Sequence, residues 1–186
     1  YIYSQTTGVF AQITDSDFTA NGNPQYCVFV DGYFVVTTDE KKFIVSALND
    51  GTNWNALDFG TAESNPDAIV APVVYKNQLF IAGGKTFEAF QNTGSGDFPF
   101  QRTGLFLQKG CFSPLSLINV QDSFMFIGGG ENESPAIWAL SGNSTQKIST
   151  PAIDNLLQGL VKAQLNLVYA WTYAQKGAYF VGFALP

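Results

Sequence analysis

The side chains that most enzymes use for acid–base or nucleophilic chemistry are scarce in this sequence. Its 186 residues include no histidine. Because the Ser-His-Asp triad, the Cys-His pair and histidine-ligated metal sites all need an imidazole, these three kinds of centre are excluded. Carboxylates remain, but the paired acids of glycoside hydrolysis meet only in space, and no spacing here singles out a pair.

Two glycine-containing stretches superficially suggest nucleotide binding. Gly84-Lys85-Thr86 matches the end of a phosphate-binding loop, but Leu79 stands where the first glycine of the loop belongs. A strand rather than the required helix is expected to follow. We therefore predict a hairpin turn at 83–85, and another at Gly128–Gly130.

Asp15 and Asp17 have the alternate spacing of the first ligands in a calcium loop. Phe18, Thr19 and Ala20 then interrupt the series of oxygen ligands, so we interpret the segment as a solvated loop. The sequence predicts no bound metal ion and no cofactor.

Residues 49–54 (Asn-Asp-Gly-Thr-Asn-Trp) resemble the Asp-box turn of sialidase-like propellers, which joins the third and fourth strands of a blade. Gly51 and Trp54 fit the pattern, whereas Asn49 and Asn53 replace the expected Asp and Thr. Even a complete Asp-box is structural, so the match supports the architecture and assigns no catalytic residue.

Aromatic and basic residues alternate between positions 98 and 112. They fit core packing between sheets, and they also fit a protein-docking surface, where aromatic residues and arginine are enriched. The candidate interface residues are Phe98, Phe100, Arg102 and Phe106.

The charge composition limits the classes of partner. The net charge is −6, the sequence pI is about 4.4, and the nine Lys and Arg form no basic run. This argues against binding a nucleic-acid backbone, an acidic sugar or a membrane surface. No apolar run approaches the ~18 residues that a membrane span needs. Only 13% of residues are charged, which fits either a surface covered by partner chains or a large β core.

A hairpin pattern recurs along the chain and sets the fold. Two runs of apolar and β-branched residues flank a short polar turn at 27–36, 73–82 and 117–127. Matching Asp31, Asn77 and Asp122 gives steps of 46 and 45 residues. Such steps predict an all-β propeller built from four-stranded antiparallel blades. The expected blades are 25–60, 69–103 and 115–149, with strands at 26–30, 33–38, 43–48, 54–59, 69–75, 79–82, 86–90, 98–103, 115–120, 124–127, 136–140 and 146–149.

One helix, at about 151–163, is expected after the third blade. Thr150 suits its N-cap and Pro151 its first turn. An apolar stripe, predicted to pack on the sheets, consists of Ile153, Leu156, Leu157, Leu160 and Val161. This insertion explains why the next hairpin turn, at Lys176, comes 54 residues after Asp122. Residues 165–184 then give half of a fourth blade.

The array can be completed in two ways. The hairpin at 1–13 could supply the outer strands of the fourth blade, closing a four-bladed ring. Alternatively the array is an arc of a larger propeller, which the abrupt ends of the sequence favour, and the chain is then a fragment. Cys27 and Cys111 occupy different positions in the repeat, so two free thiols in a reducing compartment are predicted.

The stretch from 25 to 140 resembles the packaged-DNA stabilisation proteins, or tail hubs, of short-tailed phages of enteric bacteria. The resemblance rests on residues 31–39, 46–54 and 81–86, and residues 150–153 also suit it. It covers part of the family's longer chains and marks no functional residue.

The resemblance implies a structural, non-enzymatic virion protein, made late in infection. It implies a homo-oligomeric ring in the virion tail, assembled in the host cytoplasm, that helps to close the portal channel and retain packaged DNA. The implied partners are the portal adaptor and the tail needle. A carbohydrate-binding or glycan-processing propeller is the alternative, suggested by the partial Asp-box and the aromatic residues.

Overall fold

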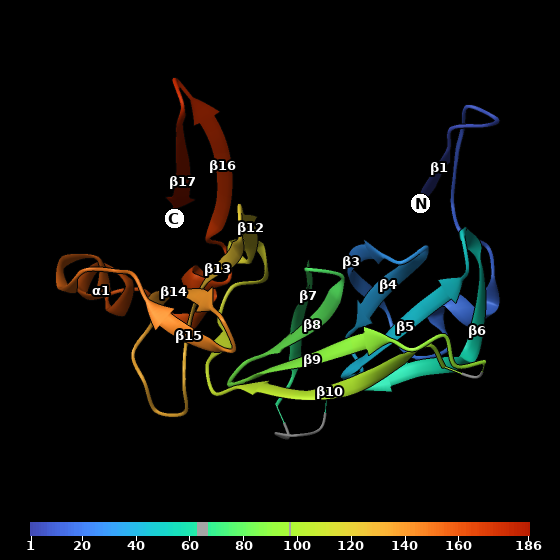
Figure 1. Ribbon diagram of the computed structural model, residues 1–186, viewed down its shortest axis with the longest axis horizontal. Coiled ribbons are helices and arrows are strands. Elements are labelled where there is room, and N and C mark those ends of the chain that lie inside the picture. The colour runs from blue at the N-terminus through green and yellow to red at the C-terminus, as the bar shows by residue number, and fades with distance from the viewer. Residues whose placement is uncertain (63–66, 97) are drawn as a thin grey trace.

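A computed structural model describes residues 1–62, 67–96 and 98–186, and antiparallel strands dominate it (Figure 1). The first complete sheet contains β3 (Pro24–Val30), β4 (Tyr33–Thr38), β5 (Lys42–Ala47) and β6 (Asp50–Thr61). The second contains β7 (Ile69–Tyr75), β8 (Gln78–Gly83), β9 (Phe87–Asn92) and β10 (Phe100–Leu107). The third contains β11 (Gly110–Cys111), β12 (Ile118–Val120), β13 (Ser123–Gly129), β14 (Ala136–Ser141) and β15 (Ser144–Lys147).

Two separate hairpins and several short helices complete the chain. The hairpins are β1 (Ile2–Ser4) with β2 (Val9–Ala11), and β16 (Tyr169–Gln175) with β17 (Ala178–Ala184). The helices are η1 (Ser16–Thr19), η2 (Pro114–Ser116), α1 (Pro151–Gln158) and α2 (Lys162–Leu165).

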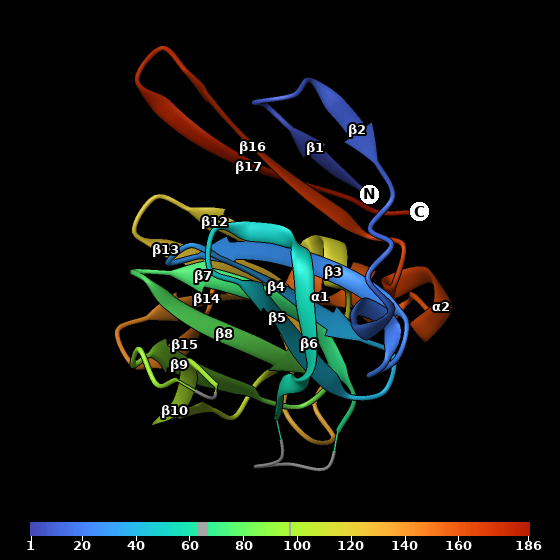
Figure 2. The same cartoon turned by 90° about the vertical axis from the view of Figure 1, so that its right-hand side faces the viewer.

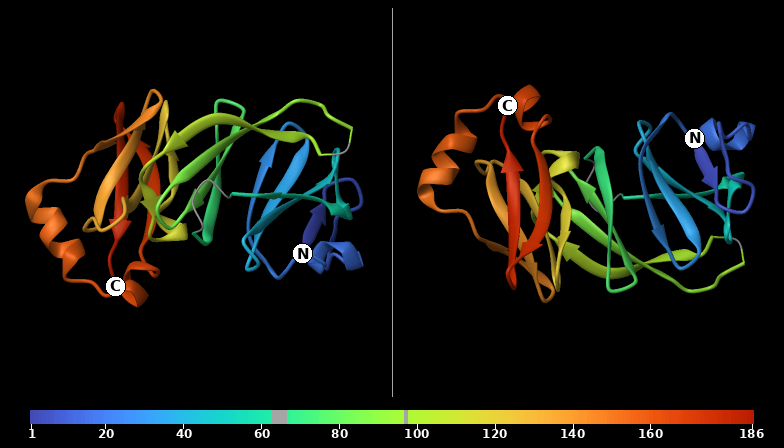
Figure 3. Two further views of the ribbon diagram at one scale, coloured as in Figure 1. Left: turned by 90° about the horizontal axis from the view of Figure 1, so that it is seen from below. Right: turned by 90° about the horizontal axis from the view of Figure 1, so that it is seen from above.

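The three complete sheets are blades arranged side by side in an arc. In each one the strands follow chain order, so every sheet is an antiparallel meander, as the sequence predicts. Figures 1 and 3 show the sheets fanning out from a concave side, with the two hairpins at opposite ends of the arc. Figure 2, seen along the arc, shows that both hairpins project on the same side of the sheets. The strands β3, β7 and β12, one from each complete blade, lie on that concave side together with β16.

The repeat is regular, but its register differs by one position from the predicted one. The hairpin turns are Asp31-Gly32, Lys76-Asn77, Gln121-Asp122 and Lys176-Gly177, and their first residues have left-handed φ values of 50°, 48°, 46° and 51°. The equivalent residues are thus 45, 45 and 55 apart. Asn77 is the second residue of its turn, so matching it to Asp31 shifted the repeat.

Corners of adjacent blades meet as a propeller requires. The Asn77 side-chain amide donates a hydrogen bond to the Asp31 carboxylate, 3.0 Å away. The Tyr75 hydroxyl donates to the backbone carbonyl of Asp122 in the next blade. These equivalent corners lie next to one another, although their residues are far apart in the sequence.

Aromatic and aliphatic side chains fill the layers between blades. The layer between the first and second blades contains Val35, Phe43, Leu79 and Phe90. The layer between the second and third contains Phe80, Phe87, Phe124 and Phe126. Each complete blade is therefore apolar on the faces that meet its neighbours, as expected for strands covered on both sides.

Glycines change the predicted third blade. Gly128 and Gly129 belong to β13 and pair with Cys111 and Gly110, so the predicted turn at Gly128–Gly130 is wrong. The predicted strand 115–120 is also wrong in part, because η2, which begins at Pro114, separates β11 from β12. Both short strands pair with β13.

The Asp-box-like segment differs from the predicted turn at 49–53. The tight turn is Leu48-Asn49, and Asp50 already pairs with Ala47. The next pair is Ser46 with Trp54, so residues 51–53 bulge out of the strand. The connection between the predicted strands 86–90 and 98–103 can be compared only up to residue 96, because Asp97 lies outside the described residues.

The helix is shorter than predicted and buries only part of its stripe. α1 ends at Gln158 because Gly159 follows, and Val161 is extended before α2 begins. The Thr150 side chain makes no capping hydrogen bond. Leu157 is buried against the third blade, with Leu160 packed beside it. The other three residues of the stripe are exposed: Ile153, Leu156 and Val161.

A substitution at Gly128 tests the close approach inside the third blade. A Cβ atom there would overlap the carbonyl oxygen of Gly110. We expect Gly128→Ala to lower the free energy of unfolding by about 1–3 kcal/mol or more, since backbone must move. Gly84→Ala is the matched control, because no atom lies within 4 Å of its new Cβ. Equal urea midpoints for the two variants would contradict this packing.

The Asp154 carboxylate, which is mostly buried, links α1 to the third blade by hydrogen bonds and predicts a pH dependence of stability. Asp154 accepts hydrogen bonds from Lys147 Nζ (2.8 Å) and Ser149 Oγ (2.5 Å), and these hold its pKa below the ordinary value. A lowered pKa stabilises the fold above about pH 4, and this contribution is lost as pH falls through the folded-state pKa.

We expect Asp154→Asn to lower the thermal midpoint at pH 7 and to reduce the loss of stability on acidification below about pH 4. Glu40→Gln, at an exposed carboxylate on the β4–β5 turn, serves as the control. A melting-temperature series from pH 7 to pH 2.5 makes the comparison. If Asp154→Asn leaves the fall of melting temperature below about pH 4 unchanged, the hydrogen bonds of Asp154 contribute nothing to stability.

Candidate functional site

The concave wall of the arc carries no charge. None of the residues in β3, β7, β12 and β16 is Asp, Glu, Lys or Arg, although the chain has 24 charged residues. Neighbouring strands of this wall contact one another, so the uncharged surface is continuous. Such a wall cannot neutralise phosphates, and it suits contact with uncharged protein surface.

A groove of about 450 Å³ crosses this wall between β3, β7 and the segment that leads into β12. Phe29 lines the groove and is 54% exposed, with Cys27 beside it on the same side of β3. Pro72 and Leu117 form the opposite parts of the lining. Sequence reasoning missed this groove. Exposed and half-buried residues alternate along β3. This pattern points to the groove only once β3 is known to lie on the concave side.

The four predicted interface residues have different surroundings. Phe100 is 3% exposed and belongs to the layer between the first and second blades, and Phe98 packs against that layer. Phe106 is 37% exposed on β10. Phe98 and Phe100 therefore act as core residues within this chain. Whether the set contacts another protein stays a prediction.

Arg102 holds the outer strand of the second blade in place. Its Nε lies 3.0 Å from the Glu88 carboxylate, whose side chain is only 5% exposed. Its Nη2 donates to the backbone carbonyl of Thr61, in the last strand of the first blade. The guanidinium also lies over the ring of Phe90, 5.9 Å from its centroid. The arginine thus links two blades and compensates a buried negative charge.

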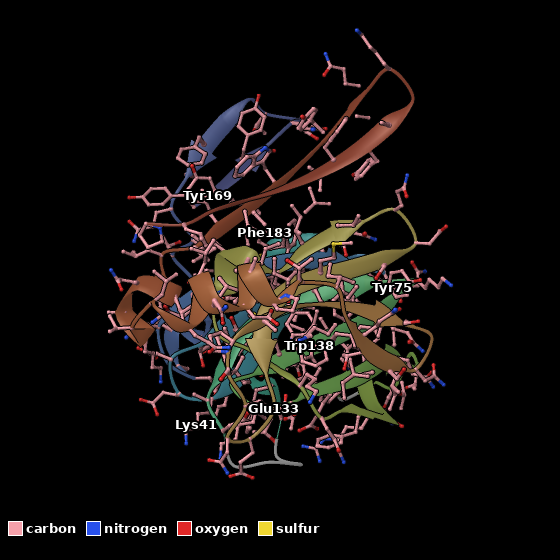
Figure 4. The ribbon with its side chains drawn as sticks, turned by 90° about the vertical axis from the view of Figure 1, so that its left-hand side faces the viewer. Lys41, Tyr75, Glu133, Trp138, Tyr169 and Phe183 are labelled. Atoms are coloured by element: carbon pink, nitrogen blue, oxygen red, sulfur yellow. The ribbon has the colours of Figure 1, made fainter. Side chains whose placement is uncertain are left out.

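Lysines near the glycine-rich segments form ion pairs rather than a phosphate site. Lys85 pairs with Glu131 across the second and third blades at 2.8 Å, which raises the pKa of Lys85 and lowers that of Glu131. Lys109 pairs with Glu133 and lies 4.7 Å from the ring centroid of Trp138. Glu133 and Trp138 are labelled in Figure 4. A strand follows Thr86, so the predicted hairpin connection is correct and the nucleotide interpretation fails.

Asp15 and Asp17 cap the outer edge of the first blade. The two carboxylates of Asp15 and Asp17 accept hydrogen bonds from the backbone N–H groups of Trp54 (2.8 Å) and Ala56 (3.1 Å) in β6. The two acids are two residues apart in the sequence, and so are the two N–H groups that they accept from. The spacing of the carboxylates therefore equals the spacing of the outward N–H groups along the edge strand β6. The segment is η1 packed on the sheet, and the prediction of a solvated loop is wrong.

The Asp-box-like bulge is held by its own hydrogen bonds. Asp50 accepts from the backbone N–H and hydroxyl of Thr52, which lower its pKa. Trp54 Nε1 donates to the carbonyl of Gly51, and the indole packs against Phe18 at 4.7 Å. These groups are engaged in the fold, so the segment supports the architecture and leaves no acid directed at a ligand.

Both cysteines are free, as predicted. Cys27 is exposed on the concave wall, whereas Cys111 is fully buried, and burial raises its pKa to about 12. In the described part of the chain no three His, Cys, Asp or Glu side chains gather as metal ligands would. The helices among the described residues are too short or too polar to cross a bilayer.

The comparison with known families accounts for the whole chain. A family model described as "Bacteriophage P22 Gp10, beta-propeller", for phage stabilisation proteins, matches residues 1–186. No curated protein matches the sequence. The matched description agrees with the blades seen in the structure and with the resemblance found in the sequence.

Removing Arg102 distinguishes its structural role from a docking role. Arg102→Leu leaves the Glu88 carboxylate buried without its cation, so we expect a loss of about 2 kcal/mol or more in unfolding free energy. Adding Glu88→Leu should recover most of that loss, because an apolar pair replaces the ion pair. Urea unfolding of the two variants measures the difference. No recovery in the double variant would mean that the pair is not what Arg102 supports.

Proposed function

The chain belongs to the phage stabilisation family, and we propose that it is a tail hub that helps to close the portal channel and retain packaged DNA. In this proposal it acts without catalysis, as a subunit of a homo-oligomeric ring in the virion tail. The portal adaptor and the tail needle are its partners. It reaches the virion by assembly in the host cytoplasm.

The uncharged concave wall in an acidic chain is the observation that carries the proposal. A protein that grips DNA must place Lys and Arg against the phosphates. Here the net charge is −6 and the wall strands hold no charged residue. Retention by this protein is therefore steric, with the ring and its partners acting as a plug.

Exposed apolar residues supply surfaces for the partners. Phe29 stands in the groove of the concave wall, and Phe106 is exposed on the outer strand β10. Phe98, Phe100 and Arg102 hold the part of the second blade from which Phe106 projects. We assign the groove to a partner inside the ring and Phe106 to a contact outside it, since exposed aromatic side chains dominate protein interfaces.

Complementation of a hub-deficient phage tests the function. Particles made without the hub should package DNA and then release it, and the full chain should restore nuclease-resistant DNA and infectious titre. Phe29→Ser should reduce retained DNA by about tenfold, the effect of losing one interface anchor. Leu57→Ser, at an exposed residue of β6, is the control and should behave as the unchanged chain.

Three results would count against this function. The first is failure of the full chain to restore DNA retention. The second is an equal effect of Phe29→Ser and Leu57→Ser, which would show that the groove takes no part in retention. The third is cleavage or tight binding of bacterial surface polysaccharide by the purified chain, which would favour the glycan-processing alternative. The bulge at 51–53 and the ring of Phe100 are engaged within the fold, which leaves less support for that alternative.

A further inference from the structure

A cavity of about 470 Å³ lies where the second blade, the third blade and α2 meet. The second blade contributes β7, the residues just before it, and the connection from β8 to β9, while the third contributes the end of β11. The volume falls within the range of about 300–1,000 Å³ that is typical of small-molecule sites. The cavity shares no lining residue with the groove of the concave wall, so it is a separate feature of the surface.

Most of the cavity lining is apolar. The apolar residues come from both blades and from α2, and they are Ala68, Val70, Cys111, Phe112 and Leu165. Cys111 and Leu165 are buried, and Val70 and Phe112 are half-buried. A hollow with this lining gives water few hydrogen-bond partners, so moving an apolar group out of water and into it is favourable.

The inserted helical segment builds one wall of the cavity. α2 contributes Lys162 and Leu165, and Asn166 follows directly after it. Leu165 and Val168 pack on the third blade, which fixes α2 there. The cavity then lies between α2 and Val70 of the second blade. The segment that lengthens the repeat from 45 to 55 residues thus shapes a binding site as well as a connection.

Three charged residues line the cavity, and two of them are already engaged. Lys85 pairs with Glu131 at 2.8 Å, and the Asp67 carboxylate accepts a hydrogen bond from the backbone N–H of Lys85. Lys162 is exposed and takes part in none of the ion pairs found among the described residues. Its ammonium is therefore available to an anionic group on a molecule whose apolar part fills the cavity.

We propose that this cavity binds a small anionic amphiphile. Its aliphatic or aromatic body lies among Val70, Phe112 and Leu165, and its carboxylate or similar head lies beside Lys162. The body contacts both blades and α2 at once, so the bound molecule holds α2 against the second blade. Because the cavity exists only in the folded chain, binding also stabilises the fold, increasingly so as the ligand concentration rises.

Titration of the purified full chain with dodecanoate, kept below its micelle concentration, is the first test. We expect one saturable site by isothermal titration calorimetry and a melting temperature that rises with added dodecanoate. The chain as a whole carries a net charge of −6, so its overall field does not attract an anion. Binding of dodecanoate therefore reports a local site.

Two variants locate the bound molecule. Ala68→Phe enlarges a side chain of the lining and should weaken binding at least about tenfold, because the apolar body loses space. Lys162→Glu should weaken binding about fivefold, the worth of one exposed ion pair. The matched controls are Ala163→Phe, on α2 but outside the lining, and Lys176→Glu, on the β16–β17 turn. Both controls should leave binding unchanged.

Absence of a saturable dodecanoate site on the folded chain would overturn the proposal. So would several weak sites that no variant changes, because these indicate adsorption to exposed apolar surface. Equal effects of each variant and its control would show that the ligand lies elsewhere. Melting temperatures without ligand show whether Ala68→Phe is folded, and Lys162→Glu, at an exposed position, tests the site independently. None of these readouts involves DNA retention, so they decide this inference separately from the proposed function.

Discussion

Burial of phenylalanine rings between neighbouring sheets is the interaction on which the rest of this structure depends. Phe43 meets Phe90 edge-on at 5.0 Å between the first two blades, and Phe124 lies within 5.6 Å of both Phe80 and Phe87 between the next two. Each ring buries roughly 150–250 Å² and adds an oriented contact. The second blade belongs to both layers, so it cannot shift without opening one of them.

The outer strands of the sheets also need partners for their backbone N–H and C=O groups. Asp15 and Asp17 satisfy the outer strand of the first blade, and Arg102 links the outer strand of the second blade to its neighbour. The α1 helix, held by Asp154, covers part of the third. The hairpin β16–β17 has no such device among the described residues.

These contacts also engage several of the chain's 15 acidic residues in the fold. Three of them show how. Asp50 holds a bulge, Glu88 pairs with an arginine, and Glu133 accepts from Lys109 and from a backbone N–H. The surface features on the described residues are an uncharged wall, a groove and exposed aromatic side chains. That set suits a structural component of a phage particle.

The sequence by itself determined the four-stranded blades, their spacing and the absence of histidine chemistry, because alternation and turn residues act over a few positions. It misplaced the register by one residue, since Lys76-Asn77 offers two polar positions and only backbone φ angles show which comes first. Tertiary structure alone decided that Gly128 lies in a strand, that Asp15 and Asp17 cap β6, and that Phe100 is buried while Phe29 is exposed. Each of those outcomes depends on which distant backbone or sheet lies opposite the residue, and local pattern carries no information about that partner.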